Sequence, residues 1–299
     1  MRSIVTGGAG FIGSNLVKAL KQREDEVVVL DIAADTCQEN RRVSGVEYYN
    51  FDIANEESSW GLFEGANIVF HLAAHSSVEF SLQHPDKSLL VNVVGTTRVL
   101  MASQKYGIQR IVFAGSCSTY GDSEQIPFVE TEVLDPKSPY ALQKQIGEQL
   151  FRLWSKVYGV SSVVLRIFNV YGKLMDPKGD YALVTGKFLD QQAKGLPLTI
   201  TGDGNQTRDF THVTDVVRAM IMASKSAQVG NGEVINIGSG RETSINELAE
   251  MFGGPTVYIP PRLEPRRALA NVQKAKLLLG WEPLMDIRAG IAELLANKT

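Results

Sequence analysis

The sequence has few cysteines, no long hydrophobic run and no excess of charge of one sign. Only two of the 299 residues are cysteine, Cys37 and Cys117, and neither has a neighbour at metal-ligand spacing. We therefore expect no disulfide and no metal site, and a reduced cytoplasmic compartment. The formal net charge is −3, so the basic balance that binding to nucleic acid or to an anionic membrane would favour is missing.

Segments for targeting, membrane insertion and repetition are also missing. No stretch approaches the roughly 18 to 20 consecutive apolar residues that cross a bilayer, and the N-terminus enters an apolar run without a signal-peptide pattern. No internal repeat of about 20 to 50 residues is visible. The sequence therefore predicts a protein free in solution, with no nucleic-acid or membrane partner.

Short apolar runs separated by helix-length segments are the main pattern that is present. They lie at Ser3–Thr6, Val27–Asp31, Ile68–Leu72, Arg110–Ala114 and Ser162–Phe168. Continuous runs of this kind are typical of parallel strands buried on both faces, with helices on either side. Beyond Phe168, glycine and proline interrupt the pattern. We expect an α/β fold, a Rossmann doubly wound parallel sheet, with a smaller C-terminal lobe and returns to the sheet after His212 and at Glu233–Ile237.

A glycine-rich turn, TGGAGFIGS, follows the first apolar run. Gly7, Gly10 and Gly13 have the GxxGxxG spacing, and a helix is predicted over Phe11–Gln22. Glycines at such a turn let the backbone approach a pyrophosphate, which then lies on the N–H groups of the helix start. The next run ends at Asp31, whose carboxylate can accept hydrogen bonds from ribose hydroxyls and would repel a 2′-phosphate. This favours NAD over NADP; the alternative is a structural turn with a surface acid.

Tyr140 and Lys144 in SPYALQKQ form a second candidate. Ser138 is expected to cap a helix in which Pro139 is the first residue. A spacing of four then puts Tyr140 and Lys144 on one helix face. An ammonium close to a phenol favours the phenolate, which is a general base usable near neutral pH. Taken alone, such a pair is also common as ordinary helix neighbours.

Further segments extend these two motifs along the whole chain. They are Asp52-Ile53, HLAA at His71–Ala74, NVVGT from Asn92, AGSCSTYGD from Ala114, LRIFNVYG from Leu165, GDGNQTRDFTHV from Gly202 and PPRLEPRRALAN near the end. With these segments the chain resembles the extended short-chain dehydrogenase/reductase family and, within it, the UDP-sugar 4-epimerases.

The resemblance implies an NAD site and a partition of the chain. The implied cofactor residues are Gly7, Gly10, Phe11, Ile12, Asp31, Asp52, Ile53, Leu72, Ala73, Ala74, Asn92, Tyr140 and Lys144. A helix-capping role for Asn92 stays open. Residues 1–168 with about 211–237 would form the NAD-binding domain, and 169–210 with 238–299 the nucleotide-sugar-binding lobe. A homodimer formed by the helices after Pro85 and Ser138 is also implied.

The same resemblance implies the catalytic and substrate-binding residues. The triad would be Ser116, Tyr140 and Lys144, and the sugar nucleotide would be held by Ser116, Tyr140, Asn169, Arg208, Arg262 and Ala268. The tail lacks the glycine that the family usually has between its arginine and its acid. Arg262 and Arg266 therefore remain alternatives for the diphosphate.

The reaction implied begins with removal of the C4 hydroxyl proton by Tyr140 and of a hydride by NAD, which gives a 4-keto sugar. Dehydratases and decarboxylases of the family need an added carboxylate where this chain has Cys117 and Ser118. We therefore expect C4 epimerisation of a UDP-hexose, UDP-glucose/UDP-galactose and/or the N-acetylhexosamine pair. Ala268 stands where members restricted to UDP-glucose carry a bulky tyrosine. A 4-keto reductase, a dehydratase, a UDP-glucuronate epimerase and a non-catalytic dinucleotide sensor are the alternatives.

Overall fold

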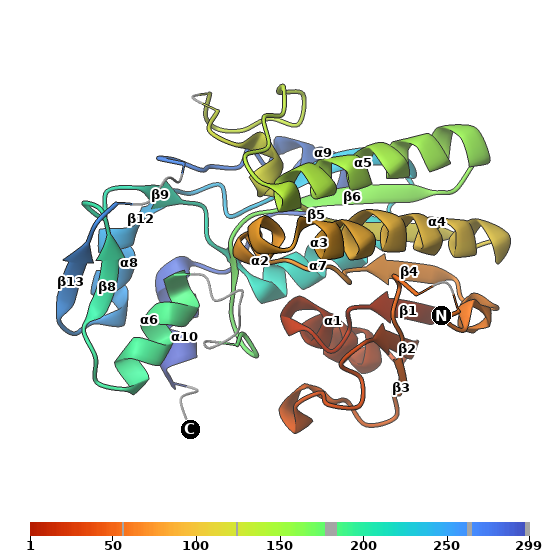
Figure 1. The fold of residues 1–299 in the computed structure, drawn as a ribbon, viewed down its shortest axis with the longest axis horizontal. Helices are drawn as coiled ribbons and strands as arrows, with labels where there is room; N and C mark the ends of the chain where they lie inside the picture. The colour runs from red at the N-terminus through yellow and green to blue at the C-terminus, as the bar shows by residue number, and fades with distance from the viewer. Residues whose placement is uncertain (56, 124, 177–183, 262–264, 297–299) are drawn as a thin grey trace.

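The computed structural model describes residues 1–55, 57–123, 125–176, 184–261 and 265–296. Its central feature is a parallel sheet of seven strands within these ranges, in the order β11-β6-β5-β4-β1-β2-β3 (Figure 1). The strands are β1 Arg2–Thr6, β2 Glu26–Asp31, β3 Glu47–Asn50, β4 Ile68–His71, β5 Arg110–Ser116, β6 Ser162–Ile167 and β11 Asn231–Ile237. The expected Rossmann α/β fold is confirmed.

The edge strand β3 is the one strand of this sheet that the apolar pattern did not predict. Its sequence EYYN is mostly exposed, whereas β4 and β6 are buried at every residue. A strand buried on both faces needs a continuous apolar run, but an edge strand can be polar because solvent reaches it. Composition alone therefore could not show it.

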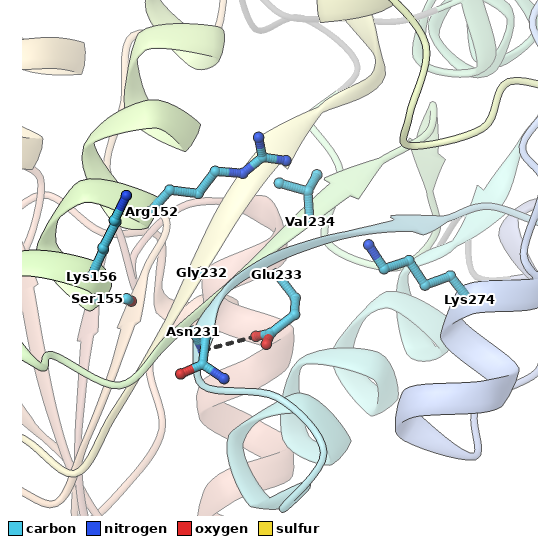
Figure 2. Close-up of a pocket in the computed structure, with 8 residues that line it drawn as sticks. All are labelled: Arg152, Ser155, Lys156, Asn231, Gly232, Glu233, Val234 and Lys274. Carbon is cyan, nitrogen blue, oxygen red and sulfur yellow. Dashed lines mark hydrogen bonds between the residues drawn. The ribbon is translucent and has the colours of Figure 1, made fainter.

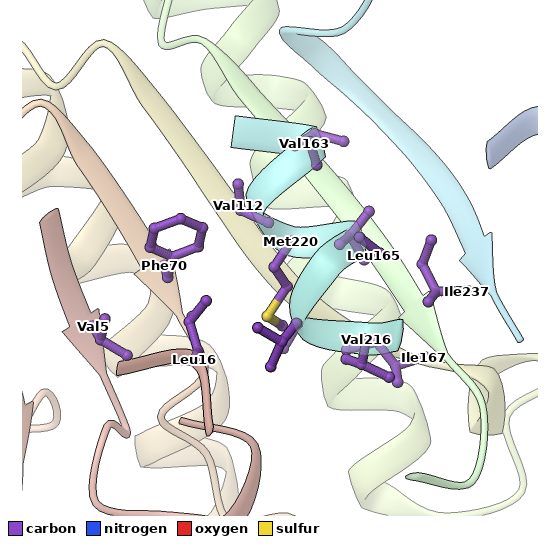
Figure 3. Close-up of a cluster of buried hydrophobic side chains, with 14 of the residues drawn as sticks. Val5, Leu16, Phe70, Val112, Val163, Leu165, Ile167, Val216, Met220 and Ile237 are labelled. Carbon is purple, nitrogen blue, oxygen red and sulfur yellow. The ribbon is translucent and has the colours of Figure 1, made fainter. Parts of the chain in front are cut away.

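One face of the sheet is covered by α1 (Phe11–Gln22), which has the predicted bounds, and by α7 (Val213–Lys225). Figure 3 shows how Leu16 of α1 and Met220 of α7 point toward Phe70 and other strand residues. These side chains are fully buried. Burying a large apolar side chain stabilises the fold by about 1.5–3 kcal/mol, so the two helices are held firmly on this face. The helix α9 (Gln273–Leu279) adds to the same cluster.

The opposite face is covered by α4 (Thr96–Lys105) and the long α5 (Pro139–Tyr158), with α2 (Val78–Gln83) and α3 (Pro85–Leu89) beside them (Figure 1). A π-helical turn joins α3 to α4. The start of α5 is the one predicted: Pro139 is its first residue, and the Ser138 hydroxyl accepts a hydrogen bond from the N–H of Ala141 at 3.1 Å. This cap fixes where Tyr140 enters the helix.

A smaller lobe lies beside the sheet and has a hydrophobic core of its own, including Phe188, Leu248 and Ile291 (Figure 1). Its main elements are α6 (Val184–Ala193), β8 (Leu198–Thr201), α8 (Ile245–Phe252), β13 (Thr256–Ile259) and α10 (Ile287–Ala296). Two short strand pairs complete the described sheets: β7 (Val170–Tyr171) with β10 (Thr211–His212), and β9 (Thr207–Arg208) with β12 (Thr243–Ser244). Among the described helices, none could cross a bilayer.

The strand order reverses direction between β1 and β4, which are neighbours in the sheet. In open parallel sheets, ligands bind outside the carboxyl ends of the strands at such a switch point. The segments that leave β1 and β4 at that edge are the glycine-rich turn and Leu72–Ala74. The topology therefore brings two sequence-predicted cofactor segments to one place.

Candidate active site

At Gly7 and Gly13, the glycine-rich turn after β1 leaves no room for a side chain. Gly7 has a φ of +74°, and a Cβ there would lie 2.6 Å from the backbone nitrogen of Ala73. A Cβ on Gly13 would lie 2.1 Å from the carbonyl oxygen of Gly7. Gly10 is the N-cap of α1 and has no side chain to cap it. The first-turn N–H groups of α1 can therefore receive an anion.

Asp31 ends β2 beside this turn. Its carboxylate accepts hydrogen bonds from the N–H groups of Ala9 and Ala33, both at 2.9 Å. The contact to Ala9 ties the acid to the glycine-rich turn itself. An anion site on a helix start with an acid next to it matches the pyrophosphate and ribose of a dinucleotide, so the residues present fit NAD.

The remaining cofactor candidates line the same edge. Ile53 is buried and packs against Gly95 of the π-helical turn, where a Cβ would lie 2.8 Å from its side chain. Thr6 holds the segment after β4, because its carbonyl and hydroxyl oxygens accept from the N–H groups of Leu72 at 3.1 Å and Ala73 at 3.3 Å. The other candidates are the exposed Asp52 and the partly buried Phe11, Ile12 and Ala74.

Asn92 is buried in the π-helical turn Leu90–Gly95 and forms a bridge between two segments. Its amide oxygen accepts from the N–H of His75 at 2.8 Å, and its amide nitrogen donates to the carbonyl of His75 at 2.9 Å and to Gln143 at 2.8 Å. Asn92 thus joins the segment after β4 to α5, and it does not cap a helix with its side chain.

Gln143 is a residue that the sequence analysis missed. It is 3% exposed and also donates to the hydroxyl of Ser88 at 2.9 Å. Its position three residues after Tyr140, on the inner face of α5, was the available signal. Through Asn92 and Ser88 it fixes α5 against the preceding helices.

Ser116, Tyr140 and Lys144 lie at the junction of β5 and α5, and all three are at most 8% exposed. Ser116 is the last residue of β5, and its hydroxyl lies 2.9 Å from that of Ser118. The Lys144 amine donates to the carbonyl of Ala114 at 2.8 Å. This hydrogen bond holds the amine against the backbone of β5, at the residue two positions before Ser116.

The aromatic and basic groups around Lys144 explain its electrostatics. Its amine lies 4.8 Å from the centre of the Phe113 ring and 5.9 Å from that of Tyr140. Burial lowers the pKa of Lys144 to about 8, although the Glu148 carboxylate opposes the shift. Burial, with a smaller effect of Lys144, lowers the pKa of His71 to about 3, so this histidine is neutral near pH 7. The amine can therefore change its charge in the range where enzymes work.

The substrate-side candidates lie on the smaller lobe and its junction. Asn169 donates to the carbonyl of Asp209 at 3.1 Å, and Arg208 donates to the carbonyl of Thr207 at 2.9 Å. Ala268 is 8% exposed and belongs to the cluster of Tyr120, Phe128 and Phe168.

Of the two alternative arginines of the tail, the structure describes one. Arg262 lies outside the described residues. Arg266 is 65% exposed and donates to both carboxylate oxygens of Asp203 at 3.1 Å. Arg266 is thus engaged by an acid of its own lobe.

Asp209 is a second residue that the sequence analysis missed. It is fully buried, and its carboxylate accepts from the N–H and hydroxyl of Ser239 at 2.5 and 2.7 Å, from Gly240 at 3.0 Å and from Ala270 at 3.1 Å. It joins the strand of Arg208 to the segment of Ala268. The acid directly after Arg208 was visible in the sequence, but its burial was not.

Two surface pockets lie away from this site. The first, of about 510 Å³, is formed by residues such as Arg152 of α5, Asn231 and Glu233 of β11 and Lys274 of α9 (Figure 2). The second, of about 430 Å³, shares Arg152 and Lys274. No triad residue lines either pocket. The first is also at the amino end of β11, whereas ligands of parallel sheets bind at carboxyl ends. We therefore place the site at the β1, β4 and β5 edge.

Comparison with known proteins agrees with this geometry. The sequence model of the NAD dependent epimerase/dehydratase family matches residues 3–238. The chain belongs to this family. The match includes the glycine-rich turn, the β5 edge and α5, and it ends at the last strand of the large sheet. The resemblance drawn from the motifs is thereby confirmed.

Individual relatives cover nearly the whole chain. A putative UDP-glucose 4-epimerase of Methanocaldococcus jannaschii is 38% identical over 297 residues, which are 96% of this chain and 95% of the relative. The crystal structure of UDP-glucose 4-epimerase from Thermotoga maritima with UDP-glucose has a TM-score of 0.94 and 34% identity, covering 99% of this chain and 98% of that one. UDP-N-acetylglucosamine 4-epimerase from Methanobrevibacter ruminantium has a TM-score of 0.90 and 28% identity, covering 99% and 98%.

Proposed function

We propose that the protein catalyses the NAD-dependent C4 epimerisation of a UDP-hexose through a 4-keto intermediate. The observation that carries this proposal is the arrangement at the junction of β5 and α5. There the Lys144 amine donates a hydrogen bond to the carbonyl of Ala114, close to Ser116 and Tyr140. Relatives named as UDP-glucose 4-epimerases support the same activity over the full length of the chain.

The cofactor site is proposed at the carboxyl edge of the sheet. Gly7 and Gly10 would receive the pyrophosphate on the start of α1, and Asp31 would accept from the adenosine ribose. The other residues that the resemblance assigns to NAD, from Phe11 to Asn92, would line the same edge. When bound, NAD would supply reversible hydride transfer at sugar C4.

The triad residues supply the proton chemistry. Tyr140 takes the proton of the C4 hydroxyl as the hydride leaves and gives a proton back when the alcohol reforms. The Lys144 ammonium favours the Tyr140 phenolate. Ser116 would donate a hydrogen bond to the reacting oxygen. Their burial keeps bulk water from competing for these contacts.

Cys117 supports epimerisation over dehydration or decarboxylation. Burial raises the pKa of Cys117 to about 11, so the thiol stays neutral near pH 7 and cannot act as the carboxylate that those reactions need. Ser118, next in the chain, is bonded to Ser116. A UDP-glucuronic acid decarboxylase of Arabidopsis thaliana is nevertheless 32% identical over 97% of this chain, so this alternative is included in the test below.

We also propose the division of labour between the lobes. Residues 1–168 with about 211–237 would bind NAD, and 169–210 with 238–299 would bind the nucleotide sugar. Asn169 and Arg208 would hold the diphosphate, because a guanidinium can make paired hydrogen bonds to phosphate oxygens. Since Arg266 is engaged by Asp203, we assign the second diphosphate arginine to Arg262.

The sugar preference is proposed to include N-acetylhexosamines. The small side chain of Ala268 lies among aromatic residues, where a methyl group leaves more room for a 2-acetamido substituent than a tyrosine would. The structural likeness to the UDP-N-acetylglucosamine 4-epimerase of M. ruminantium supports the same assignment.

A homodimer in the cytoplasm completes the proposal. Apolar side chains are exposed on the helices after Pro85 and Ser138: Leu89 and Met101 on one side, and Leu142 and Leu153 on α5. Exposed apolar side chains on neighbouring helices can form a contact between subunits. The double substitution Leu142→Glu with Leu153→Glu would put two carboxylates into this contact, so the variant should be monomeric in analytical ultracentrifugation. A dimer that persists in this variant would contradict the proposed interface. Cys37 and Cys117 are free thiols, which fits the reducing compartment proposed here.

The proposed activity is tested by incubating the purified protein with UDP-glucose, UDP-N-acetylglucosamine and UDP-glucuronate separately and resolving the C4 stereoisomers by NMR. An epimerase converts at least one substrate without net consumption of cofactor. A 4-keto reductase would consume reduced cofactor, and a decarboxylase would release CO₂ from UDP-glucuronate. Binding of NAD without any turnover would instead indicate a dinucleotide sensor.

A further inference from the structure

A buried ion pair lies behind the triad and has no part in the chemistry described above. Arg166 of β6 donates from Nε and Nη2 to the two carboxylate oxygens of Glu148 on α5, at 2.8 and 2.7 Å. The two residues are 2% and 3% exposed. Burial opposes the charge of Arg166, but the Glu148 carboxylate outweighs burial and raises the pKa of Arg166. Buried pairs often add little net stability compared with apolar residues, so stability alone is a weak explanation for this one.

Helix geometry places this pair in line with the catalytic residues. Tyr140, Lys144 and Glu148 are spaced by four residues, so they lie on one face of α5. All three are at most 5% exposed. In the buried surroundings of this face, a carboxylate one helical turn from the amine interacts with it more strongly than it would in water.

Arg166 also contacts the 3₁₀ turn that follows β5. Its guanidinium lies 4.7 Å from the centre of the Tyr120 ring, and the Tyr120 hydroxyl donates to Asn236 of β11 at 2.7 Å. Tyr120 belongs to the 3₁₀ turn that directly follows Ser116. The pair therefore fixes the orientation of Glu148 from β6 and from the turn after β5.

The titratable groups with an electrostatic effect on the Lys144 amine, or from it, come from two elements, and the Arg166 cation of β6 lies beyond them on the Glu148 carboxylate. Tyr140 and Glu148 lie on α5, and His71 lies on β4. His71 is neutral and bonded to the hydroxyls of Thr6 at 2.7 Å and Thr96 at 3.0 Å. Glu148 is thus the carboxylate that favours the charged amine against burial.

We propose that Glu148, held by Arg166, is a positioning residue that keeps the Lys144 amine charged beside Tyr140. The inference rests on the proposed epimerase function, since the charged amine matters there because it favours the Tyr140 phenolate. Glu148 itself acts only through Lys144 and touches neither the sugar nor the cofactor in this account.

The test is the pH dependence of kcat/KM. Glu148→Gln removes the carboxylate charge and keeps the shape, so the amine should lose its proton at lower pH and the alkaline limb should move down by about one pH unit. Glu148→Asp keeps the charge and should restore the limb toward that of the wild type. Loss of activity at all pH values without movement of the limb would overturn the proposal.

Two further variants separate charge from folding. Glu148→Gln leaves the Arg166 cation unpaired, which can destabilise the protein and itself disfavours the Lys144 ammonium. Glu148→Gln with Arg166→Met removes both charges, so its alkaline limb should lie between those of Glu148→Gln and the wild type. Asp215→Asn on α7 is the matched control, because Asp215 is also a buried carboxylate paired with an arginine, Arg218, at 2.8 Å. It should lower stability without moving the limb. An unmoved limb in the double variant would overturn the proposal.

A titration that needs no turnover distinguishes this inference from the proposed function. The Lys144 signal of ¹³C-lysine-labelled protein loaded with NAD, assigned with Lys144→Met, should titrate at lower pH in Glu148→Gln than in the wild type. An equal titration in both proteins would overturn the inference even if epimerisation occurs. A lowered titration in a protein that epimerises no UDP-sugar would support the inference and overturn the proposed function.

Discussion

The junction of β5 and α5 and the substrate-side edge of the smaller lobe hold their functional side chains in different ways. Tyr140 and Lys144 are at most 5% exposed, and Lys144 is bonded to the backbone of Ala114. Arg266 in the lobe is 65% exposed and bound to a surface acid, a type of pair worth about 0–1 kcal/mol. The catalytic groups are therefore fixed before the substrate arrives, whereas the arginine described at the surface of the lobe is held by an exposed ion pair. Substitutions in the first region should lower kcat or remove the cofactor, and substitutions of the residues proposed to hold the diphosphate in the second should raise KM.

The largest effect is expected at Tyr140. Tyr140→Phe removes the proposed base and should lower kcat by about 10²- to 10⁴-fold, while bound NAD, measured by release on denaturation and chromatography, stays at the wild-type level. The ring and its packing are kept, so folding should not change. Near-normal rates in this variant would contradict the assignment of the base.

Gly13→Ala tests whether the glycine-rich turn needs a residue without a side chain at this position. The new Cβ would lie 2.1 Å from the carbonyl oxygen of Gly7, and this backbone cannot move away without opening the turn. We expect a loss of about 1–3 kcal/mol in the free energy of unfolding and loss of NAD binding. Gly61→Ala is the control, because nothing lies within 4 Å of its Cβ position. Equal stability and NAD content in the two variants would reject the tight turn.

Local spacing explains why the two motifs tested by these variants could be predicted from the sequence. Gly7–Gly13 and Tyr140–Lys144 each lie within a few residues, so their geometry follows from one turn or one helix. The contacts of Asp209 and Glu148 could not be predicted in this way, because Ala270 is 61 residues from Asp209 and Arg166 is 18 residues from Glu148. Strand β3 was missed because its exposed sequence has no apolar run. The sequence thus specified the local catalytic geometry but not the long-range contacts that support it.

Arg208→Met addresses the second region. A lost charge-assisted hydrogen bond to the diphosphate should raise KM for the UDP-sugar by roughly 10- to 100-fold, with a much smaller change in kcat. Arg266→Met is the matched comparison and should leave KM near the wild-type value, since Asp203 already engages this arginine. A large KM effect in Arg266→Met would instead assign the second diphosphate contact to Arg266.

The smallest effect is expected at Ala268, and it should depend on the substrate. Ala268→Tyr places a bulky ring beside Tyr120, Phe128 and Phe168 and should lower kcat/KM for UDP-N-acetylglucosamine by about tenfold or more, with less change for UDP-glucose. The ratio of the two kcat/KM values is the measurement. An equal loss for both substrates would mean that the residue only packs the core.

Retention of a label at sugar C4 tests the central claim most directly. UDP-glucose carrying deuterium at C4, incubated with the wild-type protein in ordinary water, should give UDP-galactose that keeps the deuterium at C4, because the hydride removed from this carbon is returned to it. NMR resolves both the stereochemistry and the label. A C4-inverted product that has lost its deuterium to solvent, or no inversion of this or any other UDP-hexose tested, would contradict the account.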